Sequence, residues 1–407
     1  MEKRPFEGVN VLDFTWAGVG PFTINFLGYY GATIIRVESA SRPDPMRHAY
    51  GYSKEEKNIG LERGPIFAVT HLVKKLDISL NLKHPKGIDI FKRLVAWADV
   101  VVENFTTGVI EKMGLDYDEL KKIKPSIILH RTNGYGHTGP MASQPGAGST
   151  ITALTGFYST VGWSDRLSVP IARFYTDLIA PLAGALTLIA AIDYQRRTGE
   201  GQCIDHSQVE AGINYLGPII LDYEVNGREL VLTGNKCAYA APHGAYRCKG
   251  EDRWVAISVR NDNEWDSFCK VLGNPGWTKD TRFTTLSSRV KNSDELDKLI
   301  EKWTINFTAE QAMTIMQAVG VSAGVVATAQ DAELDPQLKH YDFFRELDHP
   351  YLGKLNFYHP PGFTLSSVPA ELAPPPLLGE HNDYICTEIL GISDEEFAQM
   401  YQEGVFD

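Results

Sequence analysis

The first forty residues alternate between short apolar runs and one amphipathic segment. VNVLDF (9–14) is an apolar run, and ATIIRVE (32–38) has the β-branched, apolar character of a buried parallel strand. Between them, PFTINFLGYYG (21–31) predicts a helix that begins at Pro21 and ends near Gly31. This strand–helix–strand order predicts an α/β domain with a parallel sheet.

The same alternation continues along the chain. KGIDIFKRLVAWA (86–98) is amphipathic and predicts a helix, whereas DVVVEN (99–104) and SIILHRTNG (126–134) predict strands. A long apolar helix is then expected between Asp177 and Gly199. Strands that alternate with helices predict an α/β fold for this part of the chain.

The pattern changes near residue 225. Short strand-like segments and turns follow, and then two helical regions at 262–273 and 293–319. We therefore predict that residues 1–225 belong to a large domain and that residues 226–340 form a smaller α+β domain. The remaining segment, 341–407, is rich in proline and ends in a helix.

Composition narrows the class of protein. The chain has 407 residues, a formal net charge of −12 and 43% hydrophobic residues, which is typical of a globular protein of two or three domains. The acidic balance argues against a nucleic-acid partner. We see no run of about 18 apolar residues and no signal peptide, so we expect a cytoplasmic enzyme without a membrane span. Five cysteines without a C-x-x-C pair predict reduced thiols, and we expect no metal site.

A dinucleotide site is the first candidate. Gly18 and Gly20 follow the first strand, and Glu38 ends the second, as in the fingerprint that binds NAD. However, Thr23 stands where that fingerprint needs a third glycine, and Pro21 removes an amide donor. We interpret the segment as a tight turn into a helix and expect no NAD.

Asp177 is the second candidate, at the start of the long apolar helix. Its side chain can cap the exposed backbone amides of the helix. It can equally act as a nucleophile, because a carboxylate is ionised at neutral pH and can form acyl intermediates without a separate base. Local pattern does not choose between the two roles.

A series of motifs in order then resembles the class III CoA-transferases, the formyl-CoA transferase/carnitine-CoA transferase family. The segments that carry the resemblance are GVNVLDFTWAGVGPFTINFLGYYGATIIRVE, KKLDISLNLKHPKG, ADVVVENFTTGVIEKMGLDYDEL, PSIILHRTNGYGHTGP, RRTGEGQCIDHS and PPPLLGEHNDYICTEILGISDEEFAQMYQEGVF. The resemblance implies an open Rossmann-like large domain to which 341–407 returns, so that both chain ends build it. It also implies an interlocked dimer and a CoA thioester as substrate.

The resemblance also implies roles for particular residues. Asp177 matches the family's catalytic aspartate, which forms an acyl anhydride and then an aspartyl-CoA thioester. The positions that match contacts with CoA are Ala17, Gly18, Lys75, Asn104, Phe105 and Asn133. For Lys75 a solvated surface lysine remains the alternative, and for Phe105 the alternative is core packing.

Two positions bear on the substrate. Gly148 stands where relatives often carry a carboxylate, so we expect a wider acyl pocket and an acceptor larger than formate or oxalate. Arg173 can hold a second carboxylate of the substrate or form a structural ion pair. These features suit a dicarboxylic or aryl-substituted succinate-type acid, with succinyl-CoA as a candidate donor.

Two other functions remain open. A 2-methylacyl-CoA racemase or intramolecular CoA isomerase would need a histidine near Asp177, and His130 and His137 are the candidates. The chain can also be the non-catalytic subunit of a heteromer, so a homodimer and a heteromer with a similar subunit are both considered.

Overall fold

A computed structural model describes residues 3–48, 60–63, 67, 70–168, 171, 174–358 and 365–407. The chain divides into two compact units. The first unit comprises 1–158, 170–228 and 341–407, and the second comprises 159–169 and 229–340. The segment 159–169, which lies within the predicted range 1–225 of the large domain, thus belongs to the second unit.

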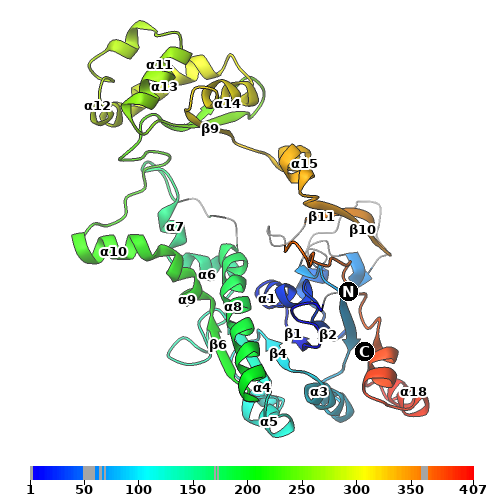
Figure 1. The fold of residues 1–407 in the computed structure, drawn as a ribbon. Coiled ribbons are helices and arrows are strands. Elements are labelled where there is room, and N and C mark those ends of the chain that lie inside the picture. The colour runs from blue at the N-terminus through cyan, green and yellow to red at the C-terminus, as the bar shows by residue number, and fades with distance from the viewer. Residues whose placement is uncertain are drawn as a thin grey trace. The chain divides into compact units, whose positions relative to one another are not determined.

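The first unit is built around parallel strands joined by helices (Figure 1). Its strands are β1 (Asn10–Phe14), β2 (Thr33–Glu38), β3 (Lys75–Ser79), β4 (Val100–Glu103), β5 (Ile128–Asn133), β6 (Cys203–Ser207), β10 (Phe344–His349) and β11 (Gly353–Tyr358). Its helices are α1 (Val19–Gly28), η1 (Pro45–Arg47), η2 (Gly60–Arg63), α3 (Pro85–Trp97), α4 (Val109–Lys112), α5 (Tyr117–Ile123), α6 (Gly148–Leu154), α8 (Tyr175–Thr198), α9 (Gln208–Ile213), η3 (Asn214–Leu216), α10 (Gly217–Asn226), α17 (Asn382–Tyr384), η5 (Ile385–Ile389) and α18 (Asp394–Gln402). A short helix, α7 (Phe157–Thr160), lies where the two units meet in the sequence.

Six strands form one parallel sheet in the order β3-β2-β1-β4-β5-β6. This order is the doubly wound one, in which right-handed crossovers place helices on both faces. Successive strand residues therefore enter different cores: Val11 and Ile34 pack on one face, whereas Leu12 and Ile35 pack on the other. Since both faces are buried, β1, β2 and β4 are largely apolar in sequence, as predicted.

Opposite ends of the chain share one of these cores. Ile385, Met400 and Phe406 pack with Phe91 of α3 and Leu12 of β1. Figure 1 shows the red C-terminal helix α18 near α3, while α8 runs beside α1. Helices α1 and α8 contact each other, and Ile24 of α1 and Leu188 of α8 pack in the second core. The predicted α/β class, with a large domain built from both chain ends, is confirmed.

Helix α8 bears on the expectation that the chain has no membrane span. Among the described residues it alone is long and apolar enough to span a membrane by length and composition, and half of its most apolar window is buried. Core helices of other proteins meet the same criterion, so the finding is weak evidence for a membrane segment. The uncharged segment of α8, 178–192, lies between Asp177 and Asp193 and is shorter than 18 residues, so the statement that no apolar run of this length occurs holds.

The second unit has its own small sheet and core. Its sheet has the antiparallel order β7-β8-β9, and helices pack on it around Val255, Phe268 and Leu296. The elements are β7 (His243–Arg247), β8 (Trp254–Ser258), β9 (Ser322–Val325), α11 (Asp262–Val271), η4 (Gly276–Lys279), α12 (Leu286–Lys291), α13 (Ser293–Thr304), α14 (Ala309–Gln317), α15 (Ala329–Leu334) and α16 (Pro336–His340). This unit is α+β in character, as predicted.

Candidate active site

A cavity of about 660 Å³ lies in the first unit at the carboxyl edge of the six-stranded sheet. Each of the six strands contributes to the cavity wall its last residue or the residue directly after it. These residues are Phe14, Glu38, Leu80, Asn104, Asn133 and Gln208. The strand order reverses between β1 and β4, and open α/β sheets bind ligands at the carboxyl edge beside such a reversal. The volume is that of a small-molecule site.

Asp177 lies on the wall of this cavity as the third residue of α8. The helix takes Phe174 as its N-cap, so the interpretation of Asp177 as an N-cap was wrong. Within the described part of the chain, no charged or hydrogen-bonding group acts on its carboxylate, and burial alone raises the pKa of Asp177 to about 6. At neutral pH the group is therefore a carboxylate without a partner among the described residues, more basic than usual and on the cavity wall.

The neighbouring helix α6 holds Asp177 in place. Thr152 of α6 and Thr176 bring their hydroxyl oxygens to 3.0 Å, and the Thr176 N–H donates to Thr152 Oγ1 at 3.2 Å. Gly148, the first residue of α6, faces Asp177 directly, and a Cβ atom there would lie 2.3 Å from Asp177 Oδ2. The space beside Gly148 is thus filled by the carboxylate, and it does not widen the pocket as the sequence analysis expected.

The loop between β1 and α1 forms the other side of the site. A Cβ atom built on Gly18 would lie 3.5 Å from Asp177 Cβ, so Gly18 is a direct neighbour of the carboxylate. Ala17 has a left-handed backbone with φ of 60°, and its N–H donates to Asp44 Oδ2 at 3.1 Å. Both predicted residues therefore lie beside Asp177 on the cavity wall.

Asn104 fastens this loop to β4. Its Oδ1 accepts from the Trp16 N–H at 2.7 Å, and its Nδ2 donates to the Trp16 carbonyl at 2.6 Å. Phe105 lies at the same wall and contacts the rings of Trp16 and Phe14 edge-on. Asn104 and Phe105 are thus at the cavity, where both also have a structural role.

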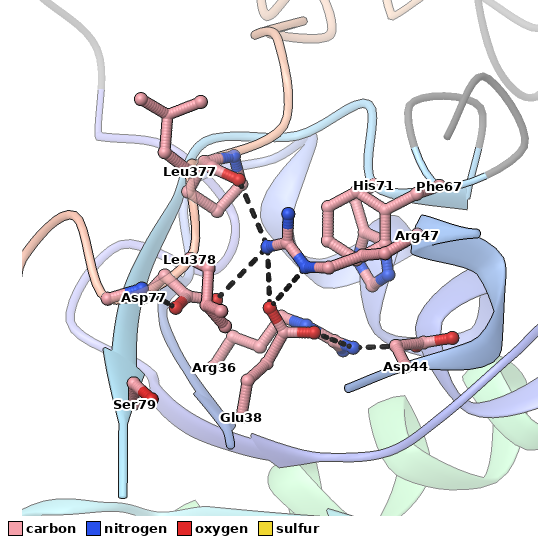
Figure 2. A network of polar contacts seen from close by, with 12 residues as sticks. Arg36, Glu38, Asp44, Arg47, Phe67, His71, Asp77, Ser79, Leu377 and Leu378 are labelled. Atoms are coloured by element: carbon pink, nitrogen blue, oxygen red, sulfur yellow. Dashed lines mark hydrogen bonds and ion pairs between the residues drawn. The ribbon is translucent and has the colours of Figure 1, made fainter. Parts of the chain in front are cut away.

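A buried network of charges stands behind this loop (Figure 2). Arg36 binds Glu38 at 2.9 Å and Asp44 at 2.7 Å, and it also donates to the Thr15 carbonyl at 3.0 Å. Arg47 binds the other oxygen of Glu38 through Nε at 2.9 Å, and the two guanidinium groups hold the pKa of Glu38 at about 2, against the effect of burial. Because Asp44 accepts from the Ala17 N–H, the network fixes the loop that faces Asp177.

Lys75 belongs to this network and is absent from the cavity wall. It is 4% exposed, and its Nζ lies 3.0 Å from Asp13 Oδ2 and 2.9 Å from His71 Nδ1. Burial lowers the pKa of Lys75, while Asp13 opposes that shift. Lys75 is therefore buried in the core. This corrects the expectation that it lies beside the nucleotide and also the alternative of a solvated surface lysine.

Two other cations lie at the cavity, and neither was predicted from the sequence. Arg42 follows β2, and Lys83 follows β3; each is exposed and lines the wall. Lys83 lies within the quoted KKLDISLNLKHPKG segment, so the motif contained the signal although the wrong lysine was chosen from it. Exposed cations at a cavity are suited to the phosphate groups of a ligand.

The remaining predicted residues are placed as follows. Asn133 lines the cavity, and its Oδ1 accepts from the N–H groups of Tyr135 and Gly136 at 3.0 and 2.6 Å, which shapes the turn after β5. Arg173 lies outside the described residues. Across the described ranges, no group of three or more histidine, cysteine or acidic side chains is placed to hold a metal ion.

The histidines considered for a racemase lie elsewhere. His130 is fully buried against His206, and burial lowers the pKa of His130 to about 3. The His137 ring lies near Glu103 and accepts from or donates to Thr107 at 3.1 Å. Neither ring is part of the wall that carries Asp177.

The fold is of the doubly wound α/β type, with a cavity of small-molecule size at the carboxyl edge of its sheet, and comparison with known proteins gives the family. The sequence model of CoA-transferase family III matches residues 6–382, so the chain belongs to this family. It is an enzyme that transfers CoA, and CoA thioesters are its substrates. The predicted family is confirmed.

Several relatives are similar over their full length. The succinyl-CoA–D-citramalate CoA-transferase of Chloroflexus aurantiacus is 31% identical over 99% of this chain and 98% of its own. The succinyl-CoA:glutarate CoA-transferase of Homo sapiens is 29% identical over 99% of this chain and 90% of its own. The crystal structure of a CAIB/BAIF family protein from Brucella suis matches with a TM-score of 0.87 and 28% identity, over 95% of this chain and all of the other.

Proposed function

We propose that this enzyme moves CoA from succinyl-CoA to a dicarboxylic acid and that Asp177 is its nucleophile. The single observation that carries the proposal is the Asp177 carboxylate, which is unpaired among the described residues and open to a cavity lined by two exposed cations. Two similar proteins are named for succinyl-CoA as donor, with citramalate and glutarate as acceptors, and both acceptors are dicarboxylic acids.

The proposed reaction consists of four exchanges. One oxygen of Asp177 attacks the thioester carbonyl, the C–S bond breaks, and a mixed anhydride and CoA thiolate result. The thiolate attacks the aspartyl carbonyl of the anhydride, which releases the donor acid as a carboxylate and leaves an aspartyl-CoA thioester. The acceptor carboxylate then attacks this thioester and re-forms an anhydride and CoA thiolate. Finally the thiolate attacks the acceptor carbonyl, so that the new thioester leaves and the Asp177 carboxylate is restored.

The environment of Asp177 suits this chemistry. Each step exchanges one anionic nucleophile for one anionic leaving group, so no proton needs to be supplied. A carboxylate without hydrogen-bond donors is less stabilised than one in water, which makes it a better nucleophile. The neighbouring Thr152–Thr176 pair limits its motion, and a fixed position lowers the entropic part of the barrier.

Arg42 and Lys83 are proposed to bind the phosphate groups of CoA. Both are exposed at the wall formed after β2 and β3, whereas Asp177 enters from α8. The acyl end of the substrate would then extend toward Asp177 while the charged nucleotide stays near solvent. Phe105 and Trp16, which also line the cavity, offer apolar surface between these ends.

We also propose that two copies of the chain associate through α8. Leu178, Leu182, Leu186 and Ile189 follow one another at helical spacing and are all exposed. Helix α10, which also belongs to the first unit, has no buried residue, so it too has surface free for an interface. An exposed apolar stripe of this kind is typical of an interface, and a second copy of the chain is the simplest partner to cover it. A heteromer with a similar subunit would use the same surface.

The test of the proposed function is a transfer assay on the whole protein. Succinyl-CoA is incubated with isotope-labelled succinate, and the label should appear in succinyl-CoA only when the enzyme is active. The Asp177→Asn variant should lose the exchange by at least about 10³-fold. Lack of exchange in the wild type with succinate, glutarate and citramalate would contradict the proposal.

A further inference from the structure

One buried side chain at the site carries an oxygen atom that has no partner among the described residues. Gln208, the first residue of α9, follows β6 and is 5% exposed. It lines the same cavity as Asp177 and Gly148. Its Oε1 is fully buried, and no donor lies within hydrogen-bond reach of it in the described structure.

The local contacts of α9 in the described structure do not use the oxygen of the Gln208 carboxamide. The preceding residue, Ser207, caps α9 by accepting from the Glu210 N–H at 3.3 Å, and the Val209 N–H donates to the Gly134 carbonyl. Neither role uses the Gln208 side chain. Buried polar groups are almost always hydrogen-bonded, so a buried amide that faces a cavity points to a partner within the cavity.

The position of Gln208 limits what that partner is. Helix α9, which begins with Gln208, contacts α8, which carries Asp177, and α6, which carries Gly148. It follows β6, at the opposite edge of the sheet from β3 and β2, after which the exposed cations lie. In the proposed reaction the side chain therefore lies at the acyl end of the substrate. A carboxamide is neutral and has both donors and an acceptor, and its two ends can exchange by rotation. It can therefore donate to a carboxylate or accept from a hydroxyl group.

We infer that Gln208 is a substrate-binding residue that recognises a second oxygen function of the acceptor acid. This inference rests on the proposed CoA transfer through Asp177. It makes one side chain, Gln208, responsible for the preference for a dicarboxylic or hydroxy acid as acceptor. A site built to hydrogen-bond a substrate group discriminates strongly against analogues that lack the group.

A contact with the pantetheine arm of CoA is the competing explanation. Every thioester substrate carries that arm, so such a contact would affect all acceptors equally. A contact with the acceptor would instead change the preference between acids of the same length with and without the second oxygen function.

The experiment compares Gln208→Met with the wild type on glutarate and on valerate, which has the same chain length and one carboxyl group. We expect kcat/KM for glutarate to fall at least about 10-fold, mainly through KM, and kcat/KM for valerate to change less than about 3-fold. Gln144→Met is the matched control, because Gln144 lines the cavity but is exposed. It should keep the preference for glutarate.

Gln208→Glu separates the two possible partners. It keeps the size of the side chain and its acceptor oxygens, but it repels a second carboxylate. If the partner is a hydroxyl group, we expect Gln208→Glu to lower kcat/KM for glutarate further and to keep kcat/KM for 2-hydroxyvalerate. A loss of kcat/KM for both acids, with kcat/KM for valerate unchanged, identifies a donor role for the amide. Either result supports recognition of the second oxygen function.

Equal losses for glutarate and valerate, or no loss for either, would overturn the inference. Binding of the two acids to the CoA-loaded protein, followed by saturation-transfer NMR, gives a readout that does not depend on turnover. Absence of CoA transfer from the wild type would contradict the proposed function, whereas an unchanged binding preference in Gln208→Met would contradict the role of Gln208 alone.

Discussion

Gly148 and Asp177 approach each other so closely that no larger residue fits at position 148. A Cβ atom there would lie 2.3 Å from Asp177 Oδ2 and 2.4 Å from Phe174 Cβ. The Phe174 atom belongs to the start of α8 and cannot rotate away. Glycine is therefore required for the carboxylate to occupy its observed position at the cavity.

Replacing Gly148 by alanine should consequently displace the nucleophile. We expect Gly148→Ala to lower kcat at least about 100-fold, because a misplacement of about 1 Å is enough for such a loss. Gly217→Ala is the control, since nothing lies within 4 Å of a Cβ atom there. Steady-state kinetics with thermal melting would check it, and near-normal turnover in a folded Gly148→Ala protein would contradict the proposed geometry.

The acyl-transfer rate should have an acidic limb. Burial raises the pKa of Asp177 to about 6, and only the carboxylate attacks the thioester. The single-turnover consumption of acyl-CoA without added acceptor should therefore fall about tenfold for each pH unit below 6. A rate that stays level down to pH 4.5 would show that the reacting group is not a carboxyl group with a raised pKa.

Glu38 should stabilise the protein in a pH-dependent way. Its pKa is about 2 in the folded state against 4.5 ordinarily, so the unfolded chain binds more protons between these values. The resulting contribution, about 3 kcal/mol, is complete above about pH 5 and is lost as the pH falls toward 2. Glu38→Gln should lower the free energy of unfolding by about that amount at pH 7, with a difference that shrinks in acid.

Urea titrations at pH 7 and pH 3 measure this difference. Glu388→Gln, at an exposed position, is the control and should be nearly neutral. A constant difference between Glu38→Gln and the wild type across the pH range would show that the ion pairs are not its source.

The apolar stripe of α8 should hold two copies together. Leu186 is 70% exposed, so Leu186→Glu costs little within one chain but places a charge in the proposed interface. Light scattering should then report the mass of a monomer, while Asp89→Lys on the exposed surface of α3 should leave the dimer intact. A wild-type protein that is already monomeric at micromolar concentration would contradict the proposal.

The strands with largely apolar sequences could be predicted, and β3, where two charges interrupt a short run, could not. VNVLDF and ATIIRVE indicated β1 and β2 because both faces of the sheet are covered. No strand was assigned to β3, where Lys75 and Asp77 interrupt the apolar pattern. These charges are buried because partners from other strands, such as Asp13, compensate them, and that compensation is a property of the fold.

Some residues of the candidate site could be predicted from the sequence, and others could not. Asp177 was found through its place at the start of an apolar helix and through the family resemblance, which also indicated Ala17 and Gly18. Gln208 carries no motif, and its importance lies in an absent hydrogen bond that only the packed structure reveals. The helix α1 begins two residues before the predicted Pro21, because Gly18 serves as its N-cap.

The central claim is that Asp177 becomes covalently acylated. The most direct measurement is a peptide mass map of the whole protein after incubation with succinyl-CoA and hydroxylamine, which converts an activated carboxyl group into a hydroxamate. We predict a hydroxamate on the peptide that contains Asp177, and none when succinyl-CoA is omitted. An unmodified Asp177 peptide under conditions in which CoA is transferred would contradict the account.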